Sequence, residues 1–334
     1  MKLQLYAAFT LLLCIAAATP AGAECVEGDC ANWKGTFMWP EGGMYRGYWS
    51  NGLRHGEGSF KDKDGTQYTG EWKNDVRHGK GKCSYPDGAL YTGEWANSVR
   101  SGTGTLVMPG NRVYTGEWHN DMMNGNGTMT WTNGETYTGQ WLNNTMHGRG
   151  AFLFANGSRY DGEWNMNRMT GRGVYTTPGS DTYTGEFMDS RRNGAGSAVW
   201  PDGSTYTGQW ENDMRSGSGS MKWADGRRYT GEWRNNRMNG RGVLIFADGS
   251  AYSGDFVDDM QTGRGTMTLK NRQRYEGEWK NNLMHGNGTM KFPNGTAYAG
   301  QWRNGEMDGY GTLTVTKGKP RKGLWKNGDL VKPE

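Results

Sequence analysis

Apolar and polar residues alternate along most of this chain, and the alternation predicts short β-strands. Tyr68, Gly70 and Trp72 alternate with polar residues, so a period of two places these three side chains on one side of an extended strand. Residues 79–85 alternate in the same way. The segment 73–78 and the Pro-Asp-Gly sequence at 86–88 separate the two runs. Two strands with short connections predict β-hairpins whose neighbouring strands are antiparallel.

This pattern recurs every 23 residues without insertion or deletion. We number each repeat from its tyrosine, which is position 0. Glycine occupies positions 2, 11 and 13, and tryptophan occupies position 4 except at Phe187 and Phe256. The position-0 tyrosines are Tyr45, Tyr68, Tyr91, Tyr114, Tyr137, Tyr160, Tyr183, Tyr206, Tyr229, Tyr252, Tyr275 and Tyr298. A fixed period of this length predicts a linear array of one structural unit, with long periodic faces in place of a single compact core.

The predicted fold is all-β, an elongated and twisted single-layer antiparallel meander of stacked β-hairpins. At ~4.8 Å between strands, twelve repeats would span on the order of 115 Å. Charge pairing suggests a register in which Trp72 lies opposite Gly79 and Glu71 opposite Lys80. The same register joins Glu163 with Arg172, Glu232 with Arg241 and Asp255 with Arg264, and no acid faces an acid. This register also places each tryptophan beside a glycine of its own repeat and beside a glycine of the preceding repeat, such as Gly58 or Gly81. These glycines are therefore predicted to form slots beneath the indole rings.

The N-terminus has the features of a secretory signal peptide. An apolar run over residues 3–18 precedes Ala21-Gly22-Ala23, a small-x-small cleavage pattern, so Glu24 is the expected first mature residue. The run is too short for a membrane-spanning helix, which needs ~20 apolar residues. We therefore expect an exported protein, either periplasmic or secreted, or in the lumen of the secretory pathway of a eukaryote. The expected organisation is a signal peptide at 1–23, a short segment at 24–32, a capping half-repeat at 33–44, twelve repeats at 45–320 and a half-repeat with a tail at 321–334.

Cysteine and charge add three expectations. Cys25 and Cys30 lie close together at the new N-terminus of an exported chain, which predicts a local disulfide. A metal pair is the weaker alternative, because no second Cys or His pair lies nearby. Cys83 stays unpaired at an apolar position. The net charge of +4 is small and its charges are interspersed, so no nucleic-acid partner is expected.

The repeated motif resembles the MORN repeat (membrane occupation and recognition nexus). It is seen in Tyr91-Thr-Gly93-Glu-Trp95 followed by Gly102-Thr-Gly104. The resemblance implies a sheet of stacked hairpins, with roles in scaffolding, dimer formation and attachment to membranes or protein partners. It implies no chemistry, because family members that are enzymes carry a separate catalytic domain. Most familiar members act in the cytosol, whereas this chain, with its predicted signal peptide, resembles exported bacterial members that have a short Cys pair before the first repeat.

No residue set suggests catalysis, a metal centre or a cofactor. His55, His78, His147 and His285 share position 10, but adjacent repeats lie ~10 Å apart, so two of them cannot bind one ion; they are interpreted as exposed residues at loop ends. The acidic row at position 3 is interpreted as a solvated, charge-balanced face. We therefore predict that the protein is not an enzyme.

The aromatic row is the candidate binding surface, since a contiguous Tyr/Trp surface commonly marks an interaction site. Its main role is expected to be structural, with binding as a second role. The nominated residues are Trp72, Trp95, Trp118, Trp141, Trp164, Trp210 and Trp233. The predicted function is a non-enzymatic exported scaffold that presents this ribbon to protein partners, including further copies of itself through exposed strand edges. The alternative is a module that binds membrane lipid head groups or polysaccharide through the Tyr/Trp face.

Overall fold

The computed structural model describes residues 22–334, so most of the predicted signal peptide lies outside the described residues. Within residues 22–334 there are 28 β-strands and no helix, and hence no helix of a kind that could cross a membrane. The chain divides into two units, Met1–Thr132 and Asn133–Glu334.

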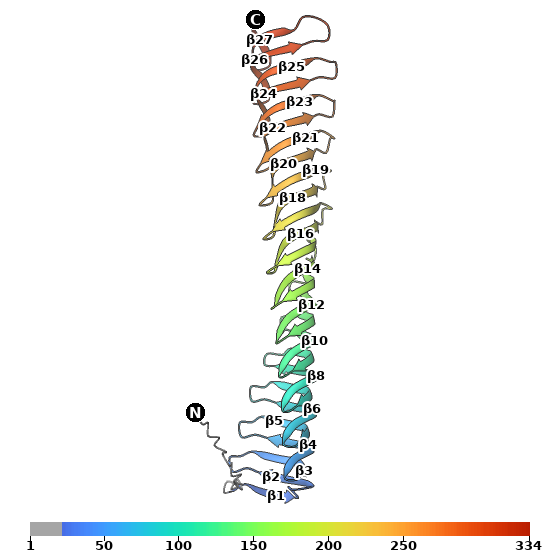
Figure 1. The fold of residues 1–334 in the computed structure, drawn as a ribbon, viewed down its shortest axis with the longest axis vertical. Helices are drawn as coiled ribbons and strands as arrows, with labels where there is room; N and C mark the ends of the chain where they lie inside the picture. Colours follow the sequence, from blue (N-terminus) through green and yellow to red (C-terminus); the bar gives the residue numbers. More distant parts are fainter. Residues whose placement is uncertain (1–21) are drawn as a thin grey trace, which may run out of the picture. The chain divides into compact units, whose positions relative to one another are not determined.

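The first unit contains ten strands, and each pairs antiparallel with the next along the chain (Figure 1). These strands are β1 (Glu24–Gly28), β2 (Lys34–Met38), β3 (Met44–Ser50), β4 (Leu53–Lys61), β5 (Gln67–Lys73), β6 (Val76–Ser84), β7 (Leu90–Ala96), β8 (Val99–Met108), β9 (Arg112–His119) and β10 (Met122–Thr130).

Within the second unit, eighteen strands likewise each pair antiparallel with the next along the chain (Figure 1). They are β11 (Thr136–Leu142), β12 (Thr145–Leu153), β13 (Arg159–Asn165), β14 (Arg168–Thr176), β15 (Thr182–Met188), β16 (Arg191–Val199), β17 (Thr205–Glu211), β18 (Met214–Lys222), β19 (Arg228–Arg234), β20 (Arg237–Ile245), β21 (Ala251–Val257), β22 (Met260–Thr268), β23 (Arg274–Lys280), β24 (Leu283–Lys291), β25 (Ala297–Arg303), β26 (Glu306–Thr314), β27 (Arg321–Lys326) and β28 (Asp329–Pro333). The predicted all-β antiparallel meander of stacked hairpins is confirmed in each unit.

The turn inside each repeat is shorter than the sequence analysis predicts. Lys73 pairs directly with Val76, which leaves only Asn74 and Asp75 in the turn. Both have positive φ, 50° and 67°, the conformation of a type I′ hairpin turn. Asn and Asp tolerate this left-handed region better than most residues. The second strand therefore begins at Val76, and the predicted six-residue linker at 73–78 is wrong.

A bulge changes the register in the middle of every hairpin. Tyr68 faces Cys83 and Gly70 faces Gly81, but Trp72 faces Arg77. Gly79, with φ of 57°, begins the extra pair of residues on the second strand. The predicted pairing of Trp72 with Gly79 is therefore wrong. Gly79 instead faces Trp95 of the next repeat.

The same bulge moves the charge pairs by one repeat. Lys80 faces Glu94, while the Glu71 carboxylate accepts a hydrogen bond from the backbone N–H of Lys80 at 2.7 Å. Glu57 lies opposite Glu71, so the predicted absence of acid–acid pairs is also wrong. The pairs predicted for Glu163, Glu232 and Asp255 within their own repeats are wrong for the same reason. Each arginine instead faces an acid of the next repeat: Arg149 faces Glu163, Arg172 faces Glu186, Arg241 faces Asp255 and Arg264 faces Glu278.

The glycine slots hold phenol rings and not indole rings, which corrects the last register prediction. A Cβ added at Gly81 would overlap the ring of Tyr68, and one added at Gly70 would meet the Gly81 backbone and the Tyr68 hydroxyl. The position-13 glycines of the other repeats bear the same relation to their own tyrosines. The slots let every position-0 tyrosine lie flat on the sheet with its side chain fully buried. The Tyr68 hydroxyl donates to the carbonyl of Glu71 at 2.9 Å. Glycine is required here by close approach of the ring.

Candidate binding faces

Tyrosine and tryptophan rings alternate along one side of the sheet, which we call the aromatic face. The Trp72 ring lies edge-on between Tyr45 and Tyr68, with ring centroids 5.4 and 5.1 Å away. Its indole N–H donates to the carbonyl of Gly58 in the preceding repeat at 3.3 Å. Such edge-to-face pairs add about 0.5–1.5 kcal/mol beyond area burial. Each tryptophan therefore joins its own repeat to the one before it.

The seven nominated tryptophans all lie in this buried row. The exposed fraction of each side chain is between 3% and 5% for Trp72, Trp95, Trp118, Trp141, Trp164, Trp210 and Trp233. A ligand would therefore meet the residues that cover the rings before it met the rings themselves. The structure gives these residues a place in the core, and the binding role named for them stays a prediction.

Arginine at position 9 covers the tryptophan rings of several repeats, which the sequence analysis did not predict. The guanidinium of Arg54 lies 4.3 Å from the ring centroid of Trp72, and Arg77 and Arg100 lie 4.3 Å from the tryptophans of the next repeats. Other repeats carry methionine at this position, which can also pack on an aromatic ring. The sequence analysis places position 9 in the linker at 73–78. Recognising Asn74-Asp75 as a two-residue turn would have placed it on the strand, opposite tryptophan.

The turn of each repeat docks on position 9 of the repeat before it, which lies between that repeat's own turn and its bulge. The backbone N–H of Arg54 donates to the Asp75 carboxylate at 2.8 Å, and the N–H of Asp75 donates to the Arg54 carbonyl at 3.0 Å. Asp, Asn or Ser takes the place of Asp75 in other repeats, as Ser98, Asp121 and Asn167 show. These contacts satisfy the backbone N–H and C=O of Arg54 beyond the end of the β4–β5 ladder, whose pairing begins at Gly56 and Trp72.

An open groove of about 580 Å³ lies on the aromatic face of the second unit. Apolar side chains from Trp223, Phe246 and Met267 line it together with Arg215 and Asp259. Trp233 is part of its floor, whereas Trp223 and Phe246 occupy position 17 and are only half-buried. We call this the aromatic-face groove. It combines accessible rings with both signs of charge.

The opposite side, which we call the polar face, also carries grooves. One of about 610 Å³ is lined by Arg264, Thr266, Glu276, Glu278 and Asn287, with a glycine floor. A second, of about 520 Å³, lies at the N-terminal end and includes Lys34, Arg46, Tyr48 and Glu57. We call this second one the N-terminal groove.

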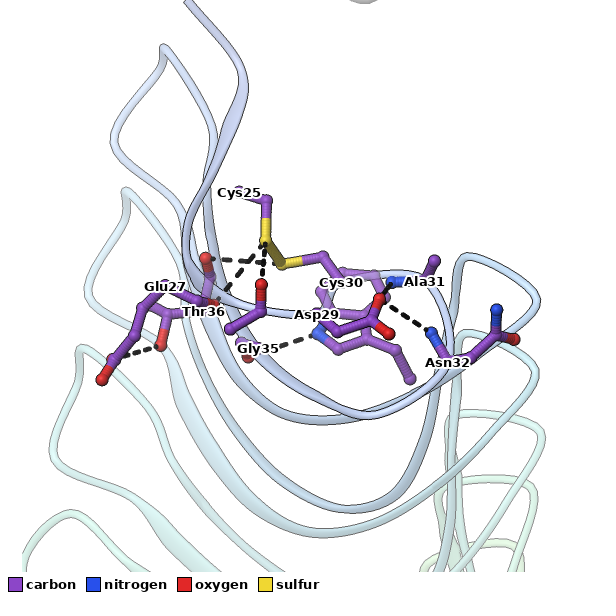
Figure 2. Close-up of a disulfide and its surroundings, with 10 residues drawn as sticks. Cys25, Glu27, Asp29, Cys30, Ala31, Asn32, Gly35 and Thr36 are labelled. Carbon is purple, nitrogen blue, oxygen red and sulfur yellow. Dashed lines mark hydrogen bonds between the residues drawn. A yellow bond between two sulfur atoms is a disulfide. The ribbon is translucent and has the colours of Figure 1, made fainter.

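The N-terminal end carries a disulfide between Cys25 and Cys30 (Figure 2). A Cβ added at Gly35 would meet the Cys30 sulfur, whereas the equivalent Gly58 would meet the Tyr45 ring. The disulfide therefore occupies the slot that a tyrosine fills in each full repeat. Cys83 is buried and free, at the apolar position where the sequence analysis placed it.

Among residues 22–334, the pKa values that depart clearly from their ordinary range belong mainly to buried tyrosines. Burial raises the pKa of Tyr183, Tyr206 and Tyr275 to about 12, which keeps these phenols neutral. His147 and His285 lie within strands and face Gln140 and Glu278, so their assignment to exposed loop ends is wrong. In residues 22–334, no group of three or more His, Cys, Asp or Glu residues is placed to hold a metal ion.

These features define a repeat protein built from hairpins that bind to their neighbours through Tyr, Trp and turn contacts. The family model described as the MORN repeat matches twelve segments, at residues 45–67, 68–90, 91–111, 114–136, 137–159, 160–182, 183–205, 206–227, 229–251, 252–274, 275–297 and 298–318. The chain belongs to the MORN repeat family.

Three solved structures show distant likeness to the chain, and no curated protein matches it. The TCP10 domain of Danio rerio CPAP, in complex with a peptide of STIL, is 14% identical, with 63% of this chain and 94% of that chain covered and a TM-score of 0.38. The SAS-4 TCP domain of Drosophila melanogaster, in complex with a proline-rich motif of Ana2, is 12% identical, with 53% and 90% covered and a TM-score of 0.30. A virginiamycin B lyase from Staphylococcus aureus is 11% identical, with 90% and 86% covered and a TM-score of 0.14. Likenesses at this level carry no argument about function.

Proposed function

We propose that this protein is a non-enzymatic, exported scaffold that binds protein partners on its aromatic face. The aromatic-face groove is the observation that carries the proposal. Its position-17 rings, Trp223 and Phe246, are half-buried, while the position-4 tryptophans beneath are covered. Aromatic residues and arginine are enriched at the centres of protein interfaces.

The polar groups around the groove suit a protein segment. The Arg227 guanidinium lies 5.0 Å from the ring centroid of Trp223 and forms a salt bridge with the Asp225 carboxylate at 2.7 Å. Arg215 donates to the side chain and carbonyl of Asn236. A peptide offers carbonyl oxygens and side chains of both signs to such a rim, and apolar side chains to the rings between. A surface of rings alone would not provide this polar rim.

Site-specific photo-crosslinking tests the binding face. A photoreactive amino acid at position 223 should capture a protein partner in the compartment where the chain resides, because residue 223 lies in the groove. The matched control is position 243 on the polar face of β20, where the valine is also accessible. The captured partner should then bind the purified protein, and Trp223→Ala should weaken that binding. Equal capture from both faces, or binding unaffected by Trp223→Ala, would contradict the proposal.

The same variant tests the lipid alternative. Vesicles of anionic lipid should not compete with the captured partner for the wild-type protein. Binding to vesicles that is lost in Trp223→Ala, with no protein captured at position 223, would favour attachment to a membrane surface instead.

Export is part of the proposal and rests on the N-terminal sequence and on the disulfide, which suits an oxidising compartment. Mass spectrometry of the protein released by cells should find a chain that begins at Glu24 with Cys25 and Cys30 joined. A chain that retains residues 1–23 in the cytosol, with both thiols reduced, would exclude export.

A further inference from the structure

The N-terminal end differs from the rest of the array at two aromatic residues, Tyr48, which lines the N-terminal groove, and Trp33, which packs on Tyr48 beside it. Tyr48 occupies position 3, where the other repeats carry Glu, Gln or Asp. Trp33 occupies position 11 of the capping half-repeat, where all twelve full repeats carry glycine. Both residues therefore add a ring to the polar face that the repeat pattern does not require for folding.

The two rings meet edge to face beside the groove, with Trp33 exposed and Tyr48 half-buried. Their centroids are 5.8 Å apart and their planes meet at 88°. The Trp33 side chain is 65% exposed, in contrast to the buried tryptophans of position 4. Lys34 lies 4.7 Å from the centre of the Tyr48 ring and holds it at the edge of the groove. Burial in the core does not account for Trp33, so its apolar surface is available to a ligand.

The groove offers hydrogen-bonding groups of balanced charge next to these rings. Lys34 and Arg46 contribute two positive charges, and Glu27 and Glu57 contribute two negative charges. Hydroxyl groups come from Thr36, Ser59 and Thr69, and the glycines of its floor have no side chains to obstruct a ligand. A groove of about 520 Å³ with balanced charge favours a neutral, strongly hydrogen-bonding ligand over an ionic one.

We propose that the N-terminal groove binds a neutral oligosaccharide, with one sugar ring stacked on Trp33. The C–H face of a sugar ring packs on an aromatic ring, while its hydroxyls both donate to carboxylates and accept from Arg and Lys. The Glu27 carboxylate already accepts from the Thr36 hydroxyl at 3.2 Å, which fixes its orientation toward the groove. The polar-face groove around Arg264 and Glu278 has the same glycine floor but no aromatic ring on which a sugar could stack.

The binding test uses the protein as cells release it and a panel of hexasaccharides. The probes are the β-1,4-linked hexamers of glucose and of N-acetylglucosamine, the α-1,4-linked hexamer of glucose and a polyuronate hexamer, each titrated by calorimetry. At least one neutral hexamer should bind, and more tightly than the polyuronate. The Trp33→Ala variant should lower the affinity for that hexamer by about tenfold or more. Its melting temperature should stay unchanged because the side chain lies largely outside the core.

Tyr310→Ala is the matched control, because Tyr310 is a polar-face aromatic that is 62% exposed and belongs to the last repeat. Its affinity for the hexamer should equal that of the wild type. The proposal is overturned if no neutral hexamer binds, if the polyuronate binds more tightly, or if Trp33→Ala binds as well as the wild type. An equal loss of affinity in Tyr310→Ala would also overturn it. None of these results depends on the aromatic-face groove.

Discussion

At the scale of single residues, the glycines at positions 2 and 13 decide where the aromatic rings lie. The Tyr68 ring covers Gly81, where a methyl group would overlap it, and the Tyr68 hydroxyl lies over Gly70, where a methyl group would also meet the Gly81 backbone. Tryptophan then packs between successive tyrosines and does not enter the slot. The two kinds of ring therefore have different neighbours, and substitutions at each should act in different ways.

A double-mutant cycle tests the slot. Gly81→Ala should destabilise the array because the new methyl group forces the Tyr68 ring off the sheet. In a Tyr68→Ala background the same substitution should cost much less, with a coupling free energy of roughly 1–3 kcal/mol measured by urea denaturation. A similar cost in both backgrounds would show that steric overlap with Tyr68 is not the reason for glycine.

Tryptophan should act through burial. Trp118 lies 5.4 Å from the Tyr91 ring, 5.1 Å from the Tyr114 ring and 4.3 Å from the Arg100 guanidinium. Trp118→Ala should therefore lower the free energy of unfolding by about 3–5 kcal/mol. Trp118→Phe should cost less, because Phe187 and Phe256 occupy the same position with the same tyrosine neighbours. Loss of partner binding in Trp118→Ala with an unchanged melting temperature would overturn the structural assignment.

At the scale of the hairpin, the register near the turn differs from the register near the tyrosine, and the bulge joins the two. The Asn-Asp turn pairs Lys73 with Val76, whereas the Tyr68 ring needs Gly70 opposite Gly81. The two pairings differ by two residues, so a bulge at Gly79 must absorb the difference. The Glu71 carboxylate then occupies the space beside Gly79 and accepts the N–H of Lys80. The acidic row is thus part of the bulge as well as a solvated face.

The contact between a turn and position 9 of the preceding repeat can be measured at Asp121. Its carboxylate accepts the backbone N–H of Arg100 at 2.9 Å, and its φ is 64°. Asp121→Ala should cost about 2 kcal/mol, because it leaves that N–H without its acceptor and places alanine in the left-handed region. Asp121→Asn should be nearly neutral, since Asn236 accepts the N–H of Arg215 in the same way. Equal melting temperatures for the two variants would contradict this role.

The sequence predicts the strand pattern because period-two alternation directly reports which face a residue occupies. It also predicts the pairing near tyrosine, where Gly70 and Gly81 face each other. The bulge was missed because charge pairing fits the wrong register: Lys80 is close in space to both Glu71 and Glu94. The candidate site was harder still. Whether Trp33 or Trp72 is exposed depends on what covers each ring, and the Arg54 cover comes from another strand.

At the scale of the whole array, a buried tyrosine phenol recurs in every full repeat. Burial raises the pKa of all twelve position-0 tyrosines above the ordinary value of 10.0. Each phenol is protonated and neutral in the folded state and lies between two strands of its repeat. Because every full repeat contains one such phenol, ionisation of the tyrosines should lower the stability of all the repeats over the same pH range.

This predicts unfolding at alkaline pH. Unfolded tyrosine releases its proton near pH 10, whereas the folded pKa of Tyr183, Tyr206 and Tyr275 is about 12. Between these values the unfolded state binds fewer protons than the folded state, so the free energy of unfolding falls as pH rises. The contribution is fully present below pH 10 and is lost toward pH 12. Tyrosinate absorbance and the loss of β-sheet circular dichroism should therefore change together in this range. Titration of all the tyrosines near pH 10 with the sheet intact would show that the phenols are accessible in the folded protein.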